Sequence, residues 1–160
     1  MLLTEAVISA VYDNGGDVLK LIGDGILAIF AGDPAAEACR SAIAAQTALH
    51  DRIVTLNHRR AAENLPTTQV YLGLHIGEVF YGNIGSDERL DFTVVGPAVN
   101  EVARIAAMCR SVERNVLVSQ AFADAMARLE RGRLVSVGRY ALRGVERPQE
   151  LFTLDPFATL

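Results

Sequence analysis

The spacing of apolar residues changes several times along the chain. Over residues 3–13 apolar side chains recur every three or four positions, which predicts a short amphipathic helix that ends at Gly15-Gly16. Two apolar runs, 18–22 and 26–30, then flank a Gly-Asp-Gly sequence, which is typical of a β-hairpin. The chain therefore opens with a predicted helix followed by a predicted hairpin.

A second helical pattern begins after Asp33-Pro34. Asp33 is placed to cap this helix and Pro34 to occupy its first position. Its apolar positions are again three and four residues apart: Ala38, Cys39, Ala42, Ala45, Leu49, Ile53 and Leu56. The pattern fades into a polar stretch, and Pro66 ends it, which predicts one long helix.

Strand and helix patterns alternate through the rest of the chain. The predicted elements are strands at 69–76, 79–85 and 89–95, a helix at 97–110, a strand at 115–119, a helix at 121–130 and a strand pair at 134–142 and 149–154. In the first of these strands Gly73, His75 and Gly77 share one face, and the apolar residues share the other. The order predicts an α+β fold, with helices on a mostly antiparallel sheet, in a single domain over 1–160.

Composition limits the possible partners. Hydrophobic residues make up 51% of the chain and charged residues 21%, which is typical of a globular protein. The net charge of −4 argues against nucleic acid or an anionic membrane as a partner. No apolar run reaches the ~18 residues of a membrane span. Cys39 and Cys109 lack the spacing of a zinc site, so we expect buried thiols in a cytoplasmic protein.

Polar residues in apolar surroundings are the first candidates for chemistry. Asp24 sits at the tip of the predicted hairpin, and Lys20 lies four residues before it. Asp-Gly is also ordinary turn chemistry, and most lysines are simply solvated. Thr93, on the strand predicted at 89–95 just before the helix at 97–110, is likewise an ordinary strand former. Taken singly, these residues do not decide between a structural and a functional role.

The helix predicted at 97–110 carries a second group of candidates. Asn100 and Arg104 are four residues apart and so share one face. Asparagine is a poor helix-interior residue and needs a reason to be there, whereas Arg104 could simply pair with Glu101. Arg143 lies before a glycine turn near the C-terminus. The three histidines are expected to be structural or exposed.

Four segments together resemble a known family. GGDVLKLIGDGILAIF, GLHIGEVFYGNIGS, RLDFTVVGPAVNEVARI and LRGVERPQELF are similar to successive signature segments of the class III nucleotidyl cyclase catalytic domain. The resemblance extends from about residue 5 to residue 154 and includes the motifs KxxGD and TxxGxxVNxxxR. It implies a ferredoxin-like, palm-type fold that works as a head-to-tail dimer, either a homodimer or a heterodimer with another cyclase domain.

The resemblance also implies a reaction and a site. Such enzymes convert a nucleoside triphosphate into a cyclic mononucleotide and pyrophosphate, with two Mg²⁺ or Mn²⁺ ions held by two aspartates. The matching residues here are Lys20 and Thr93 for the base, Asn100 and Arg104 for the ribose and transition state, Asp24 as the second metal aspartate, and Arg143 where the family usually has a triphosphate-binding lysine.

Hydrogen bonding favours ATP as the substrate. The ammonium of Lys20 only donates and suits the N1 acceptor of adenine, while the hydroxyl of Thr93 can accept from its 6-amino group. Guanine N1 carries a hydrogen and would face Lys20 donor to donor, which costs about 1–3 kcal/mol. Guanylate cyclases of the family typically carry Glu and Cys at these two positions. The sequence therefore predicts an adenylate cyclase domain.

The sequence departs from the family at its start. The family's first metal aspartate lies on an opening strand, in a segment resembling DxxGFT, which the sequence lacks before Lys20. Glu5, Asp13 and Asp17 are not in a context to replace it. A sheet without its N-terminal strand and a weakened metal half are therefore expected. Three interpretations remain open: a truncated adenylate cyclase, a non-catalytic or half-catalytic partner of an intact cyclase, and a generic ferredoxin-like binding domain with coincidental motifs.

Overall fold

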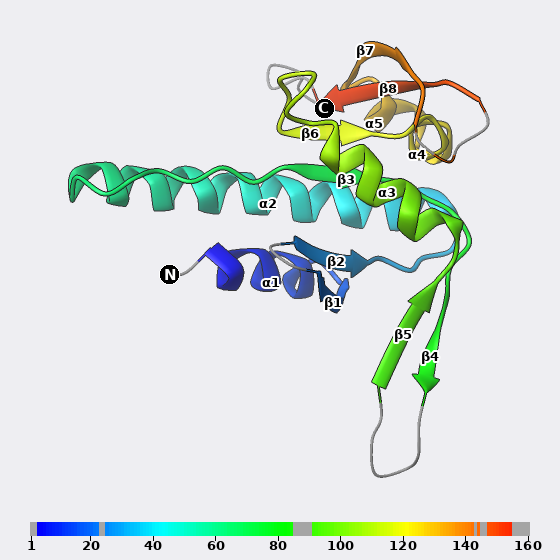
Figure 1. The fold of residues 1–160 in the computed structure, drawn as a ribbon, viewed down its shortest axis with the longest axis horizontal. Coiled ribbons are helices and arrows are strands. Elements are labelled where there is room, and N and C mark those ends of the chain that lie inside the picture. The colour runs from blue at the N-terminus through cyan, green and yellow to red at the C-terminus, as the bar shows by residue number, and fades with distance from the viewer. Residues whose placement is uncertain (1–2, 23–24, 85–90, 143, 145–146, 155–160) are drawn as a thin grey trace. The chain divides into compact units, whose positions relative to one another are not determined.

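The computed structural model describes residues 3–22, 25–84, 91–142, 144 and 147–154 (Figure 1). Contacts between residues divide the chain into two compact units, Met1–Val70 and Tyr71–Leu160. Each unit has its own helices, its own strands and its own buried residues. In the part of the chain that the structure describes, no helix is both long enough and apolar enough to cross a membrane.

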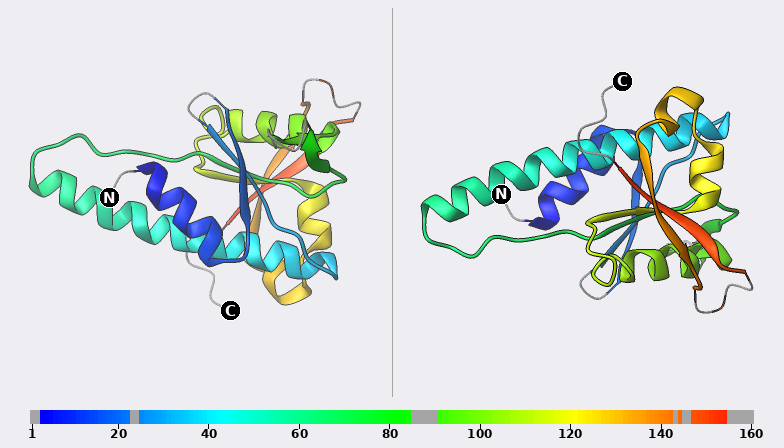
Figure 2. Two further views of the ribbon diagram at one scale, coloured as in Figure 1. Left: turned by 90° about the horizontal axis from the view of Figure 1, so that it is seen from below. Right: turned by 90° about the horizontal axis from the view of Figure 1, so that it is seen from above.

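The first unit is a helical pair with a hairpin. Its elements are α1 (Leu3–Asp13), β1 (Asp17–Ile22), β2 (Gly25–Ile29) and α2 (Ala35–Ala62). α1 runs alongside α2 and buries Ala6 and Ala10 (Figures 1 and 2). Arg52 of α2 donates to Ser9 Oγ at 2.8 Å and to Asp13 Oδ2 at 2.9 Å. The predicted first helix and antiparallel hairpin are confirmed.

The start of α2 corrects one prediction. Pro34, not Asp33, occupies the N-cap position, and no side chain makes a capping hydrogen bond there. The carbonyl of Pro34 accepts from the backbone N–H of Glu37 at 2.9 Å, as the carbonyl of a capping residue does. Asp33 therefore lies one residue before the position from which a side chain caps the helix, and α2 begins at Ala35.

The second unit contains a four-stranded sheet and a separate hairpin. Its elements are β3 (Leu72–Leu74), β4 (Phe80–Ile84), β5 (Asp91–Val95), α3 (Pro97–Ala107), β6 (Val116–Val118), α4 (Gln120–Ala125), α5 (Arg128–Arg131), β7 (Leu134–Tyr140) and β8 (Gln149–Leu154). The sheet order is β3-β6-β8-β7, and β4 pairs with β5 alone. The β3–β6 pair is parallel and the other pairs are antiparallel. The α+β class and the mostly antiparallel pairing are confirmed.

Two predicted elements of this unit differ in extent. The strand expected at 69–76 is paired only over Leu72–Leu74. The helix expected at 121–130 is two helices, because Met126 and Ala127 adopt extended backbone angles between α4 and α5. Met126 is buried, whereas Leu129, one helical turn later, is 85% exposed. The burial pattern of one continuous helix therefore stops at Met126.

The core of the second unit forms where α3 meets the sheet. Its buried residues are Ile105, Cys109, Leu117, Leu142 and Leu151. The expectation of buried thiols is confirmed for both Cys39 and Cys109. Burial raises the pKa of the Cys109 thiol, whose Sγ–H donates to the carbonyl of Leu72 at 3.5 Å. This thiol behaves as a packed core group rather than as a nucleophile.

β3 and the residues after it approach α3 closely through two glycines. A Cβ at Gly73 would lie 2.9 Å from both Ala106 N and Val102 O, and one at Gly77 would lie 2.8 Å from the Cβ of Ala98. Real Cβ atoms do not come this close to backbone. The face predicted to carry Gly73, His75 and Gly77 is therefore the face against which α3 packs.

Replacing Gly73 with alanine is expected to destabilise the protein by about 1–3 kcal/mol, because the added methyl group forces α3 away from β3. The free energy of unfolding, measured with urea, checks this value. Ala107→Leu adds more volume at an exposed position of the same helix, and its effect should stay within about 0.5 kcal/mol. Equal stability of the Gly73→Ala variant and the wild type would contradict the close packing.

Candidate functional site

α3 carries the two candidate residues that the structure places together. The helix begins after Gly96, with Pro97 in its first turn, as the sequence predicts. Ala98 and Ile105 are buried, while Asn100 is exposed and Arg104 is half-buried. Asn100 and Arg104 are one helical turn apart and so lie on the same side of the helix. α3 therefore packs through one side and presents an amide and a guanidinium on another.

Arg104 lies against the backbone of the segment that follows β7. A Cβ at Gly144 would lie only 2.8 Å from Arg104 Nη1, and Gly144 has a φ of +85°. A side chain at this position would be strained and would also displace the guanidinium. Glu101, the alternative partner of Arg104 expected from the sequence, instead bonds to His75 and Gln149.

For the other candidates the structure gives a position in a strand or no description. Thr93 lies in β5, with its backbone opposite Gly82 of β4, and Lys20 lies in β1 opposite Leu27 of β2. Lys20 belongs to the first unit, whereas Thr93, Asn100 and Arg104 belong to the second. Asp24 and Arg143 lie outside the described residues. The roles of these four residues, like those of Asn100 and Arg104, stay predictions.

A network of hydrogen-bonded polar side chains links α3 to residues of the sheet and of the segment after β3. His75 Nδ1 lies 2.7 Å from Ser119 Oγ, and His75 Nε2 lies 2.9 Å from Glu101 Oε2. Gln149 donates to the other carboxylate oxygen of Glu101 at 2.7 Å, and the backbone N–H of Phe122 donates to Ser119 Oγ at 3.0 Å. The sequence pattern places His75 on one face with Gly73 and Gly77 but does not reveal these partners.

One protonation state of His75 satisfies the hydrogen bonds of this network. Burial lowers the pKa of His75, and the charge and hydrogen bond of Glu101 oppose that effect only in part. A neutral imidazole with its proton on Nε2 donates to Glu101 and accepts at Nδ1 from the hydroxyl of Ser119. The side chain of His75 is only 6% exposed, so it is a buried structural histidine, as expected.

Comparisons with known proteins agree with this fold. No family model matches the chain. An uncharacterized protein of Mycobacterium tuberculosis is 36% identical over 148 residues, which cover 91% of the chain and 26% of that protein. An adenylate cyclase of Anabaena cylindrica is 33% identical over 111 residues, 69% of the chain and 22% of the cyclase. The chain spans about a quarter of the length of the curated relatives it matches.

Solved cyclase structures share the arrangement of elements. The adenylyl cyclase CyaB from P. aeruginosa matches with a TM-score of 0.78 and 22% identity, over 95% of the chain and 78% of CyaB. The guanylyl cyclase Cya2 matches with a TM-score of 0.76 and 23% identity, over 97% of the chain and 79% of Cya2. The chain belongs to the class III nucleotidyl cyclase catalytic domains. The expected cyclase fold is thereby confirmed, whereas the missing N-terminal strand stays a prediction.

Clusters of metal-ligating side chains were the next feature expected of a cyclase site. Over 3–22, 25–84 and the described residues beyond, no three His, Cys, Asp or Glu side chains lie close enough to hold an ion. Asp24, the predicted metal ligand, lies outside these ranges. The metal role of Asp24 stays a prediction, and we assign no chemical step to a metal.

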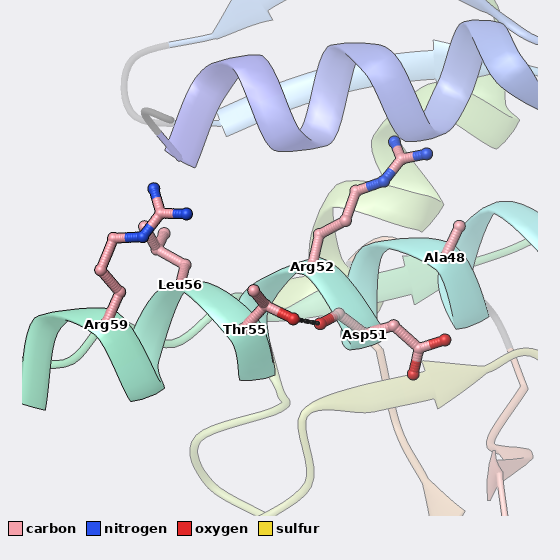
Figure 3. Close-up of a pocket in the computed structure, with 6 residues that line it drawn as sticks. All are labelled: Ala48, Asp51, Arg52, Thr55, Leu56 and Arg59. Carbon is pink, nitrogen blue, oxygen red and sulfur yellow. Dashed lines mark hydrogen bonds between the residues drawn. The ribbon is translucent and has the colours of Figure 1, made fainter.

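A hollow of about 380 Å³ on α2 of the cyclase domain is lined by Ala48, Asp51, Arg52, Thr55, Leu56 and Arg59. Figure 3 shows Arg52 and Arg59 pointing from the helix toward the same side and Asp51 pointing away. Arg52 already donates to Ser9 and Asp13, and Thr55 donates to the carbonyl of Asp51. None of the predicted site residues lines this hollow.

Proposed function

We propose that this cyclase domain takes part in converting ATP into 3′,5′-cyclic AMP and pyrophosphate. The observation that carries the proposal is α3, which packs through Ala98 and Ile105 and presents Asn100 and Arg104 one turn apart. The similarity to an adenylate cyclase over 69% of the chain supports the same conclusion. In this proposal Asn100 orients the ribose and Arg104 stabilises the transition state.

The reaction needs positioning and charge stabilisation more than covalent chemistry. The ribose 3′-oxygen forms a bond to the α-phosphorus as the bond to the leaving pyrophosphate breaks, and the hydroxyl proton passes to solvent. The guanidinium of Arg104 stays protonated and can donate two hydrogen bonds to phosphate oxygens as their charge grows. The amide of Asn100 both donates and accepts, which suits sugar oxygens. Together they hold the reacting atoms in line.

Nucleotide choice is assigned to Lys20 and Thr93. This assignment rests on their match to the family motifs and on the donors and acceptors of adenine. Arg143, next to the glycine that Arg104 contacts, is proposed to bind the triphosphate, and Asp24 to bind one of the divalent ions that the family uses. The domain is proposed to act in a dimer, either with a second copy of itself or with another cyclase domain.

The test is cyclic AMP formation from ATP in the presence of Mn²⁺. The purified chain is assayed alone and mixed with a second class III cyclase domain whose own counterparts of Asn100 and Arg104 have been replaced by alanine. That second domain is inactive alone, so cyclic AMP formed in the mixture depends on residues of this chain. The expected result is activity in the mixture well above that of either chain alone.

The outcomes separate the interpretations. Cyclic AMP in the mixture but not with the lone chain supports a half-catalytic partner. Equal rates with the lone chain and the mixture support a complete cyclase and contradict the expected weakness of its metal half. No cyclic AMP under either condition overturns the proposed function.

A further inference from the structure

We infer that His75 and Glu101 are positioning residues that hold α3 so that Asn100 and Arg104 are correctly presented; this inference rests on the proposed function. Neither side chain is among the candidates that the sequence motifs identify. Both act through α3 rather than by touching the nucleotide.

The first argument is where Glu101 lies. It directly follows Asn100 and precedes Arg104 by three positions, so it belongs to the same two turns of α3. Its two oxygens bond to His75, just after β3, and to Gln149, the first residue of β8. One carboxylate thus fixes these turns of the helix both to the end of β3 and to the start of β8.

The second argument is the close packing on either side of His75. Gly73 and Gly77, two residues before and after it, allow α3 to approach almost to backbone contact. At this distance a polar bond at Glu101 sets the rotation of the helix about its axis, which packing against glycines alone does not. A rotated α3 would aim both Asn100 and Arg104 away from the substrate.

The third argument is that the histidine and the serine of this network are buried and that their hydrogen bonds are used within the protein. Ser119 is 0% exposed, and its Oγ already accepts from the backbone N–H of Phe122. Such a serine cannot reach a substrate, so Ser119, His75 and Glu101 do not form a hydrolytic triad despite their geometry. A largely buried hydrogen-bond network instead rigidifies the elements that it joins.

The test uses volume-conserving variants in the two-chain assay. His75→Leu removes both hydrogen bonds of the imidazole, and Glu101→Gln leaves one donor facing another, because an amide accepts only at its oxygen. We expect kcat to fall about 10- to 100-fold with the KM for ATP changed less than about threefold, since small misplacements of catalytic groups mainly lower the rate. His75→Gln keeps a donor toward Glu101 and should recover much of the loss.

Two controls separate positioning from folding. His58→Leu makes the same change at an exposed position of α2, and Glu63→Gln does so at the exposed residue that ends this helix. The rates of both control variants should match that of the wild type. Urea unfolding shows whether each variant is folded at the assay temperature. Because His75 and Glu101 share one hydrogen bond, the double variant should lose less than the product of the two single effects.

The results distinguish the two proposals. An inactive wild type overturns the proposed function and this inference together. An active wild type with folded His75→Leu and Glu101→Gln variants of unchanged kcat overturns only the inference. Multiplicative losses, or no recovery in His75→Gln, would also overturn it, because they exclude a shared hydrogen bond as the cause.

Discussion

Replacing Arg104 with alanine is expected to lower the rate of cyclic AMP formation about 10²- to 10³-fold, the usual cost of removing one donor to a transition-state charge. Arg104 projects from α3 one turn after Asn100, and its guanidinium lies against Gly144. The KM for ATP should change far less than kcat, because the charge that Arg104 is proposed to stabilise develops only during the reaction. Steady-state rates in the two-chain assay give both quantities.

Two further variants sharpen this prediction. Arg104→Lys keeps a positive charge but loses the planar pair of donors, so it should not restore the wild-type rate. Arg110→Ala removes an exposed arginine shortly after the same helix, one that stacks on Tyr71, and should leave the rate nearly unchanged. A rate for Arg104→Ala within threefold of the wild type would remove Arg104 from the mechanism.

The second large effect is a change of substrate. Lys20→Glu combined with Thr93→Cys should shift the ratio of kcat/KM values toward GTP by roughly tenfold to hundredfold, since Glu accepts from guanine N1–H where the ammonium of Lys20 clashes with it. Parallel assays with ATP and GTP measure the ratio. Thr55→Cys, at an exposed position of α2, is the matched control and should keep the wild-type preference.

Lys20 also permits a direct measurement of nucleotide contact. It is the only lysine in the chain, so an amine-reactive reagent modifies one side chain besides the terminal amine. ATP should protect Lys20 from this reagent when it binds at the proposed site. An unshifted substrate ratio together with unprotected Lys20 would contradict its assignment to the base.

The sequence predicts the elements of the fold well because local rules govern them. Alternation places Gly73, His75 and Gly77 on one face, and α3 packs against that face. The four-residue spacing of Asn100 and Arg104 likewise fixes their relative position once the helix forms. The shared strand face and the shared side of the helix follow from the periods of strand and helix, whereas the packing of α3 against that face does not.

Other features depend on contacts between distant parts of the chain. Ser119, the partner of His75, is 44 residues away from it, and no local pattern indicates which oxygen will meet the imidazole. The break between α4 and α5 falls at Met126, which is buried, and contains no proline or glycine that would have indicated it from the sequence. The cap expected at Asp33 is wrong by one residue, because Pro34 itself takes that position.

The parallel pairing of β3 with β6 has a consequence for the order of folding. Leu72 lies opposite Val116, and the whole of β4, β5 and α3 is enclosed between these partners. Bringing β3 and β6 together lowers the entropy of this long segment before stabilising contacts form. β7 and β8 pair across a short connection, so their pairing carries a smaller entropy cost. An intermediate that holds only the β7–β8 pair lacks β3 and β6, which α3 also contacts, so the final position of α3 depends on the completed sheet.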